Sequence, residues 1–248
     1  MSKPRIAIDI NEVLRGTFQS FLRHYESEYG LIDDDEIVYS YDYFKDYEWA
    51  EEELIEEILR EDLDETISPN EYVIDEATGR APVDAIAFRK EVTLLSPEDV
   101  FNEFMYVEYV YQIFGGAPEA YRNLSADFQI FHKKYSEDYD LILVSKDNPI
   151  VVPSTLFFLS KIKTKISTIK FVKSSEEMWN SCDILITTDP DIVNSEVPKD
   201  KSLVKFSRPY NSESEVDGDF LQLCDLVDEE NKKEKVNKFK KILKKYGK

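Results

Sequence analysis

Carboxylates, hydroxyls and amides follow several apolar segments of this chain, which is where catalytic side chains are often found. The polar residues in such places are Asp9, Asn11, Ser145, Lys173, Thr187, Thr188 and Asp189. His24 and His132 are the only histidines, and Cys182 and Cys224 are the only cysteines. The chain therefore has too few cysteines and histidines for a typical zinc site, and few histidines that could serve in a serine–histidine triad. Any catalysis by this chain has to use carboxylates.

Five short apolar segments must position these side chains. They predict strands at residues 5–9, 140–145, 169–172, 183–187 and 202–206. Helical patterns lie between them, and strands that alternate with helices indicate right-handed crossovers and a parallel sheet. We therefore predict a three-layer α/β fold in which the carboxyl ends of the strands meet at one edge of the sheet.

The region between the first two strands has a different composition. Residues 31–117 include runs of acidic residues and the helical pattern of an amphipathic segment. We interpret them as an inserted, mainly helical, acidic cap. The core domain then consists of residues 1–30 and 118–228.

The end of the chain is basic, in contrast to the rest. Residues 229–248 contain nine lysines around the apolar residues Val236, Phe239, Ile242 and Leu243. This pattern predicts an amphipathic helix. We expect its apolar stripe to dock in a groove and its lysines to face acidic surface, either this chain's or a partner's.

Length, composition and charge exclude several classes of protein. With 248 residues and 42% hydrophobic residues the chain is long and apolar enough to build a sizeable core. No apolar run approaches the roughly 20 residues needed to span a membrane, and the first residues do not resemble a signal peptide. A formal charge of −20 argues against general nucleic-acid binding. We expect a cytoplasmic protein with two reduced thiols.

The order of the polar residues resembles the haloacid dehalogenase (HAD) superfamily, and more narrowly its 5′-nucleotidase-like branch. That family has Asp-x-Asp after the first strand, Ser or Thr after the second, Lys near the third and paired acids after the fourth. The resemblance covers about residues 4–30 and 120–211. The segments most similar to that branch are CDILITTDPD at residues 182–191 and KF at 205–206 with PYN at 209–211. The resemblance implies a HAD-like core with an inserted cap.

The resemblance also implies a role for each residue. Asp9 takes the place of the nucleophile that attacks phosphorus, and Ser145 and Lys173 take the places of the phosphate-binding hydroxyl and lysine. If Mg²⁺ is bound, Asp9 and Asp189 are the expected ligands. Otherwise no cofactor is expected.

Two departures from the family pattern affect the chemistry. Asn11 replaces the aspartate that transfers protons, and an amide cannot do so. Thr187 and Thr188 replace the paired acids, and neutral oxygens hold a hard cation less well than carboxylates. Purely structural interpretations also stay open: Asp9 as a helix cap, Ser145 as a turn hydroxyl and Lys173 as a solvated lysine.

Three functions are compatible with this pattern. The favoured one is a catalytically degenerate HAD-like protein that serves as a structural or binding component of a larger assembly, such as a virus or phage particle. Its protein partners would meet the acidic cap and the Lys-rich C-terminal helix. The alternatives are a Mg²⁺-dependent phosphatase or 5′-nucleotidase with Asp9 as nucleophile, and a regulator that binds a nucleotide or phosphate without hydrolysing it. The sequence favours a pseudoenzyme without deciding whether the chain is an enzyme.

Overall fold

A five-stranded parallel sheet organises the chain. The computed structural model describes residues 3–29, 101–211 and 220–246. The strand order is β3-β2-β1-β4-β5 and all neighbouring pairs are parallel. The strands are β1 (Arg5–Asp9), β2 (Asp140–Ser145), β3 (Ile169–Phe171), β4 (Ile184–Thr187) and β5 (Ser202–Lys205). The predicted parallel α/β sheet is confirmed.

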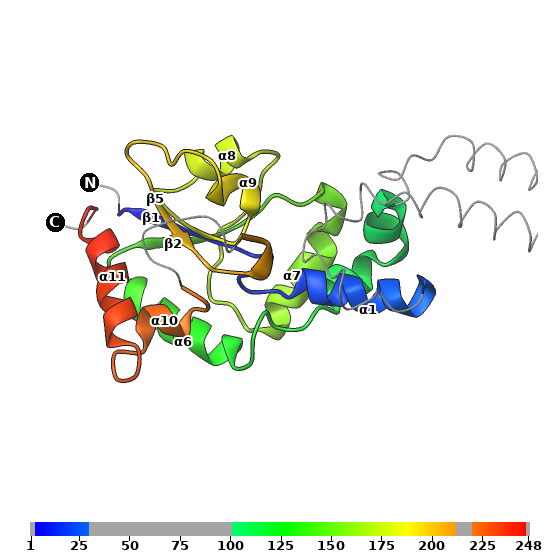
Figure 1. Ribbon diagram of the computed structural model, residues 1–248, viewed down its shortest axis with the longest axis horizontal. Coiled ribbons are helices and arrows are strands. Elements are labelled where there is room, and N and C mark those ends of the chain that lie inside the picture. Colours follow the sequence, from blue (N-terminus) through cyan, green and yellow to red (C-terminus); the bar gives the residue numbers. More distant parts are fainter. Residues whose placement is uncertain (1–2, 30–100, 212–219, 247–248) are drawn as a thin grey trace, which may run out of the picture. The chain divides into compact units, whose positions relative to one another are not determined.

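The core lies on both faces of this sheet, because side chains alternate along each strand. Ile6 and Ile8 of β1 belong to one buried cluster, and Ala7 between them belongs to another. The helices whose apolar residues join the first cluster are α6 (Leu124–Tyr135), α7 (Val152–Lys161), α10 (Cys224–Val227) and α11 (Lys233–Leu243). Those that join the second are α8 (Ser175–Asn180) and α9 (Pro190–Val193). Figure 1 shows α8 and α9 on one side of the sheet and α6, α10 and α11 on the other, which confirms the three layers.

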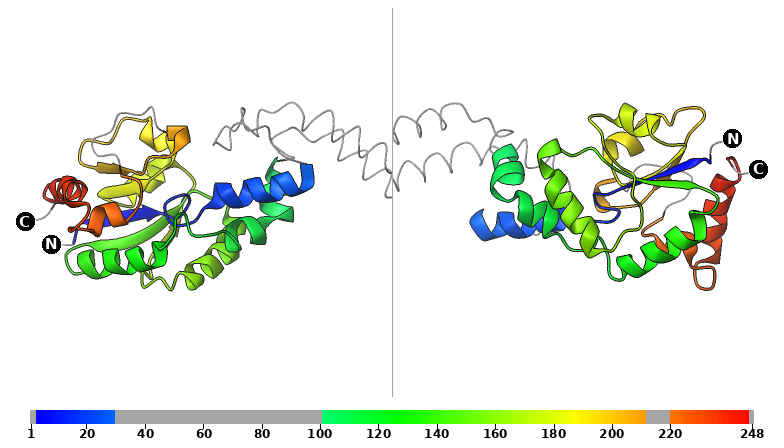
Figure 2. Two further views of the ribbon diagram at one scale, coloured as in Figure 1. Left: turned by 60° about the horizontal axis from the view of Figure 1, so that its bottom comes forward. Right: turned by 180° about the vertical axis from the view of Figure 1, so that it is seen from behind.

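Several further helical elements complete the described part of the chain. Helix α1 (Thr17–Tyr29) follows β1, and the π-helix η3 (Tyr111–Gly115) contacts both α1 and α7. Figure 2 shows α1 and α7 beside this segment in both views. The remaining elements are the π-helix η2 (Phe104–Glu108) and the 3₁₀-helices η4 (Pro149–Val151) and η5 (Pro209–Asn211).

One predicted helix begins later than its pattern suggests. The sequence predicts a helix from about residue 118, whereas α6 begins at Leu124. Asn123 has a φ of 71°, in the left-handed region, which a right-handed helix cannot include. The residues before it pair with the loop after β1, where Gly16 N–H donates to the carbonyl of Pro118.

Residue contacts divide the chain into two compact units. One comprises Met1–Tyr39 and Tyr109–Lys248, and the other Ser40–Glu108. Of the predicted cap, residues 31–100 lie outside the described residues, and the predicted boundaries at 31 and 117 stay a prediction. Residues 111–115 form η3, which belongs to the first unit.

Helix α11 is part of the core. Val236, Phe239 and Leu243 are at most 6% exposed, and Phe239 packs edge-on against Phe220 and Tyr135. The predicted apolar stripe is thus covered by this chain's own core. A partner of this helix would meet its lysines.

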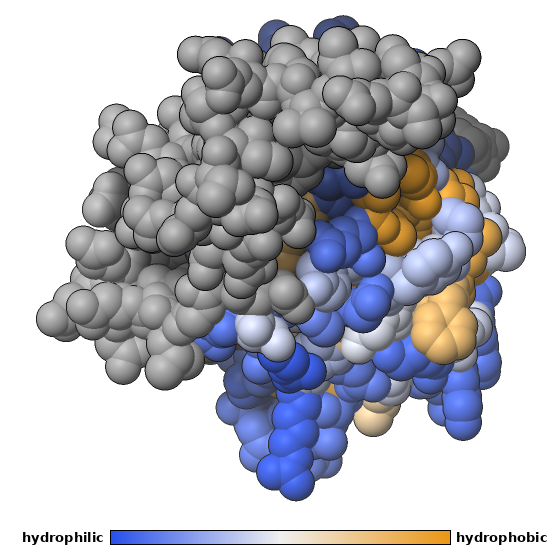
Figure 3. Space-filling model, turned by 90° about the vertical axis from the view of Figure 1, so that its right-hand side faces the viewer, coloured by the Kyte–Doolittle hydropathy of each residue, from blue (hydrophilic) through white to orange (hydrophobic). Residues whose placement is uncertain are grey.

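Several large apolar side chains of the described surface are exposed near the carboxyl edge of the sheet. Tyr111 of η3 and Phe157 of α7 are 67% and 59% exposed. Figure 3 looks at the side of the molecule where α1 lies and shows apolar patches among hydrophilic side chains. No described helix is long and apolar enough to cross a membrane.

Candidate functional site

Three neighbouring strands bring the first candidate residues together. β1 lies between β2 and β4, so the carboxyl ends of these strands are adjacent. The Thr187 hydroxyl donates a 2.6 Å hydrogen bond to Asp9 Oδ2, and Asp9 Oδ1 accepts a 3.3 Å bond from the N–H of Asn11. Asp9 pairs in register with Val144, which places Ser145 beyond it on the next strand.

Asp9 is buried among other acidic groups. It is 5% exposed, and this burial, together with the charges of Asp189 and Asp147, raises its pKa from 3.8 to about 8. A raised pKa favours the protonated form of this carboxyl at neutral pH. A protonated carboxyl is a poor nucleophile, so attack on phosphorus would first require its ionisation.

Arg15 is a fully buried cation that joins the loop after β1 to the loop after β2. Its side chain is 0% exposed and forms a 3.0 Å ion pair with Asp147. Its Nη1 donates to the Thr155 hydroxyl at 2.9 Å and to the carbonyl of Phe114 at 3.1 Å. The guanidinium also lies 4.9 Å from the Phe114 ring centroid. The guanidinium of Arg15 therefore binds groups of this chain and not a ligand.

Asn11 orients this arginine. Its Oδ1 accepts hydrogen bonds from Arg15 Nη2 at 2.5 Å and from the Thr17 hydroxyl at 3.0 Å. Its Nδ2 donates to Asp147 Oδ1 at 2.7 Å. The amide thus satisfies an arginine donor and a carboxylate acceptor at once, which a carboxylate at this position could not do.

The hydroxyl of Ser145 is directed to a neighbouring carboxylate. Ser145 is fully buried and donates a short hydrogen bond to Asp147 Oδ2, the oxygen that also pairs with Arg15. Binding a phosphate through this hydroxyl would require it to leave Asp147.

A second cation neutralises Asp189. Lys146 Nζ lies 2.7 Å from Asp189 Oδ2 and 3.0 Å from Asp191 Oδ2. Although partial burial lowers the pKa of Lys146, the hydrogen bond and charge of Asp189 outweigh it and raise that pKa above its ordinary value. Asp189 Oδ1 accepts from the N–H of Asp191, which caps helix α9. Both oxygens of Asp189 therefore have partners within the chain.

Lys173 is placed apart from this cluster. It lies beyond the edge strand β3 and is exposed, and its backbone N–H donates to Glu177 Oε2 at 2.9 Å. Within the described residues, no hydrogen bond or ion pair joins its side chain to the residues around Asp9.

The loop after β5 closes the other side of the cluster. Asn211 Nδ2 donates to the carbonyl of Thr188 at 2.8 Å, and the Tyr210 hydroxyl bonds to the Thr188 side chain. Burial raises the pKa of Tyr210. Arg208 Nη2 donates to the carbonyl of Glu12, a residue with a φ of 56°. A non-glycine residue in this region is strained, and such strain is common near functional sites.

Glu12 has its own structural role. Its Oε1 accepts a 2.7 Å hydrogen bond from the N–H of Phe18 in the first turn of α1. Burial raises its pKa from 4.5 to about 7. Glu12, rather than Asp9, thus accepts the backbone hydrogen bond at the start of α1.

The donor set does not suit the Mg²⁺ ion that the resemblance implies. Among the residues that the structure describes, no three His, Cys, Asp or Glu side chains are placed to hold a metal ion. Thr187 offers only a neutral oxygen, and Asp189 is paired with Lys146. We therefore derive no chemistry from a metal at this site.

Sequence reasoning missed the two cations and one carboxylate. Lys146 and Asp147 directly follow Ser145, and Arg15 lies four residues after Asn11. Part of the signal was present, because Lys146 and Asp147 directly follow a predicted strand end, whereas Arg15 lies six residues after one. Which of them turn inward depends on loop conformation and not on residue type.

Comparisons with known proteins add one finding. No protein-family model and no curated protein matches the chain. Among solved structures, this chain is similar to a crystal structure of a dehalogenase, with a TM-score of 0.47 and 11% sequence identity, over 91% of this chain and 96% of the other.

Proposed function

We propose that this chain is a HAD-like protein whose strand-end site does not hydrolyse phosphate esters, and that it acts as a binding component of a larger protein assembly. The order of Asp9, Ser145 and Thr187 on three adjacent parallel strands supports the HAD-like part of the proposal. The contacts of these residues support the loss of catalysis.

The main observation behind the proposal is that two cationic side chains of this chain form ion pairs with the carboxylates of the site. The guanidinium of Arg15 pairs with Asp147, and the ammonium of Lys146 pairs with Asp189. In a metal-assisted phosphatase, carboxylates hold the ion and cationic groups bind the phosphate. Here the cations and carboxylates neutralise each other, so neither is available without breaking a partly buried pair.

Proton transfer is also missing from the site. Asn11 stands where the leaving group would need an acid, and its amide is engaged by Arg15 and Asp147. General acid–base catalysis contributes about 10²–10⁴ in rate, so its loss alone makes hydrolysis slow.

The test is a phosphatase assay with p-nitrophenyl phosphate and a nucleoside monophosphate, with Mg²⁺ and with EDTA. We expect the wild-type chain and Asp9→Asn to be indistinguishable from background. Turnover of about 1 s⁻¹ that Mg²⁺ supports and Asp9→Asn abolishes would establish the alternative, a phosphatase or nucleotidase. The triple variant Asn11→Asp, Thr187→Asp, Thr188→Asp, checked for folding by circular dichroism, tests whether the missing groups account for the inactivity.

The assembly part of the proposal is supported by the separation of charge along the chain. Residues 31–66 contain sixteen acidic and two basic residues, and five lysines of the segment around α11 are exposed: Lys233, Lys238, Lys241, Lys244 and Lys245. Opposite charges on different segments favour contacts between chains that weaken as salt screens them.

Sedimentation velocity at low and high salt tests this part. We expect wild-type oligomers at 20 mM NaCl that dissociate at 500 mM, and mainly monomer when the five exposed lysines are changed to Gln. The variant should stay folded, because these side chains are exposed, and circular dichroism checks this. A wild-type chain that is monomeric at both salt concentrations would remove self-assembly from the proposal.

A further inference from the structure

A pocket lies at the opposite edge of the sheet from the candidate site. It has a volume of about 410 Å³ and is formed at the amino ends of β1 and β2, by helix α6 and by the residues before β3. The six-residue strand β2 separates it from Ser145 and Asp147. This pocket is therefore independent of the cluster around Asp9.

The charge of the pocket is opposite to that of the molecule. Lys3, Arg5 and Lys165 line it, and Asp140 is the single carboxylate among its lining residues. Asp140 Oδ2 is already paired with Arg5 Nε at 2.9 Å. Among the residues that the structure describes, no carboxylate forms an ion pair with Lys3 or Lys165, so the pocket is positive in a chain of formal charge −20.

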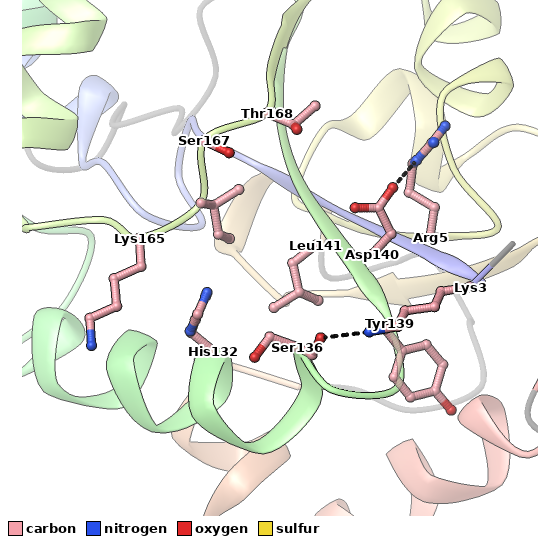
Figure 4. A pocket seen from close by; sticks show the side chains of 11 residues that line it. Lys3, Arg5, His132, Ser136, Tyr139, Asp140, Leu141, Lys165, Ser167 and Thr168 are labelled. Atoms are coloured by element: carbon pink, nitrogen blue, oxygen red, sulfur yellow. Dashed lines mark hydrogen bonds and ion pairs between the residues drawn. The ribbon is translucent and has the colours of Figure 1, made fainter.

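The neutral lining groups are suited to an oxyanion. Ser167 and Thr168 carry exposed hydroxyls before β3, and His132 is half-buried on α6. Figure 4 shows His132 and Lys165 at one end of the pocket and Lys3, bonded to the carbonyl of Ser136, at the other. Hydroxyl and ammonium groups are hydrogen-bond donors for the oxygens of a phosphate group.

The pocket is larger than an inorganic anion needs. Its volume falls within the range of about 300–1,000 Å³ that is typical of small-molecule sites. Leu141 and Ile166 add apolar surface to its lining. A ligand with one anionic end and a small organic body matches this combination.

We propose that this pocket binds a small phosphomonoester, with Lys3 and Lys165, at its two ends, supplying the positive charge. The proposal is separate from the proposed function, because no residue of the pocket belongs to the cluster around Asp9. The proposed site lies at the amino ends of β1 and β2, and binding there needs neither Asp9 nor a metal.

Isothermal titration calorimetry with glycerol 3-phosphate, inorganic phosphate and glycerol tests the proposal. We expect glycerol 3-phosphate to bind with a Kd of about 1 mM or lower, inorganic phosphate to bind more weakly and glycerol not to bind. The affinity should fall between 50 and 300 mM NaCl, because the lysines are exposed.

Variants then locate the site. Lys3→Gln with Lys165→Gln should weaken binding about tenfold or more and leave the Tm unchanged. Lys133→Gln, an exposed lysine of α6 outside the pocket, is the matched control and should bind as wild type. No binding by the wild-type chain, equal binding by the double variant, or loss of binding in Ser145→Ala but not in the double variant would each overturn the proposal.

Discussion

At the scale of single residues, Asp9 couples the candidate site to pH. Its pKa is raised from 3.8 to about 8 by burial, so between these values the folded chain holds a proton that the unfolded chain has lost. Stability then falls as the pH rises through this window, by up to about 1.4 kcal/mol per pH unit. Asp9→Asn removes this dependence. We expect the free energy of unfolding of Asp9→Asn, relative to wild type, to rise by roughly 2–3 kcal/mol from pH 5 to pH 7.

Urea denaturation at both pH values, in EDTA, measures this difference. Glu12, whose pKa is also raised, is present in both proteins, so its contribution largely cancels in the comparison. A difference between the two proteins that stays constant with pH would show that Asp9 is ionised in the folded chain.

Arg15 is a second buried residue, and its charge is balanced by an ion pair with Asp147. Removing one partner of a buried ion pair leaves the other charge uncompensated, at a cost of about 3–5 kcal/mol. We expect Arg15→Met to destabilise the chain by that amount and Arg15→Met with Asp147→Leu to recover part of the loss. A double-mutant cycle on unfolding free energies, completed by Asp147→Leu alone, measures the coupling. Additive effects would mean that the 3.0 Å pair contributes no specific interaction.

At the scale of elements, one buried carboxylate fastens α11 to α10. Asp225 is fully buried, lies 2.6 Å from Lys232 Nζ and 2.8 Å from Lys235 Nζ, and accepts the N–H of Leu221. Although burial opposes it, these hydrogen bonds hold the pKa of Asp225 below its ordinary value. The stabilisation is therefore present at neutral pH and is lost as the pH falls below about 4.

We expect Asp225→Asn to lower the free energy of unfolding by about 2 kcal/mol at pH 7. The matched control is Glu234→Gln, which breaks an exposed 3.8 Å pair with Lys238 on the same helix and should cost less than about 0.5 kcal/mol. Guanidinium denaturation of both variants gives the comparison. If both variants lost the same unfolding free energy, the apolar contacts of α11 alone would hold it against the core.

At the scale of the whole molecule, the excess of acid opposes the compact state. With 51 acidic and 31 basic residues the folded chain repels itself at neutral pH. At about 0.1–0.15 M salt, the repulsion between exposed charges more than about 8–10 Å apart is largely screened. We expect the Tm at pH 7.5, measured on protein dilute enough to be monomeric at both salt concentrations, to rise by several degrees when NaCl is increased from 20 to 500 mM, as followed by differential scanning calorimetry. A Tm that falls instead would mean that local pairs such as Lys146–Asp189 outweigh the net repulsion.

The sequence alone was sufficient for the strands and for the edge at which the polar residues meet. The residues of β1 and β2 form apolar segments, which are typical of strands covered on both faces. Because parallel strands end at one edge, Asp9, Ser145 and Thr187 could be predicted to lie near each other. The apolar stripe of α11 was also readable, from the helical spacing of Val236 and Phe239.

Only the tertiary structure decided which partners those residues have. The ion pairs of Arg15 with Asp147 and of Lys146 with Asp189 join loops after different strands, and they depend on the strand order and on a left-handed residue at Glu12. Lys173 is exposed because β3 is an edge strand. Residue types limit which charges can pair, but burial and distance determine which pairs form, and both arise only when distant segments pack together.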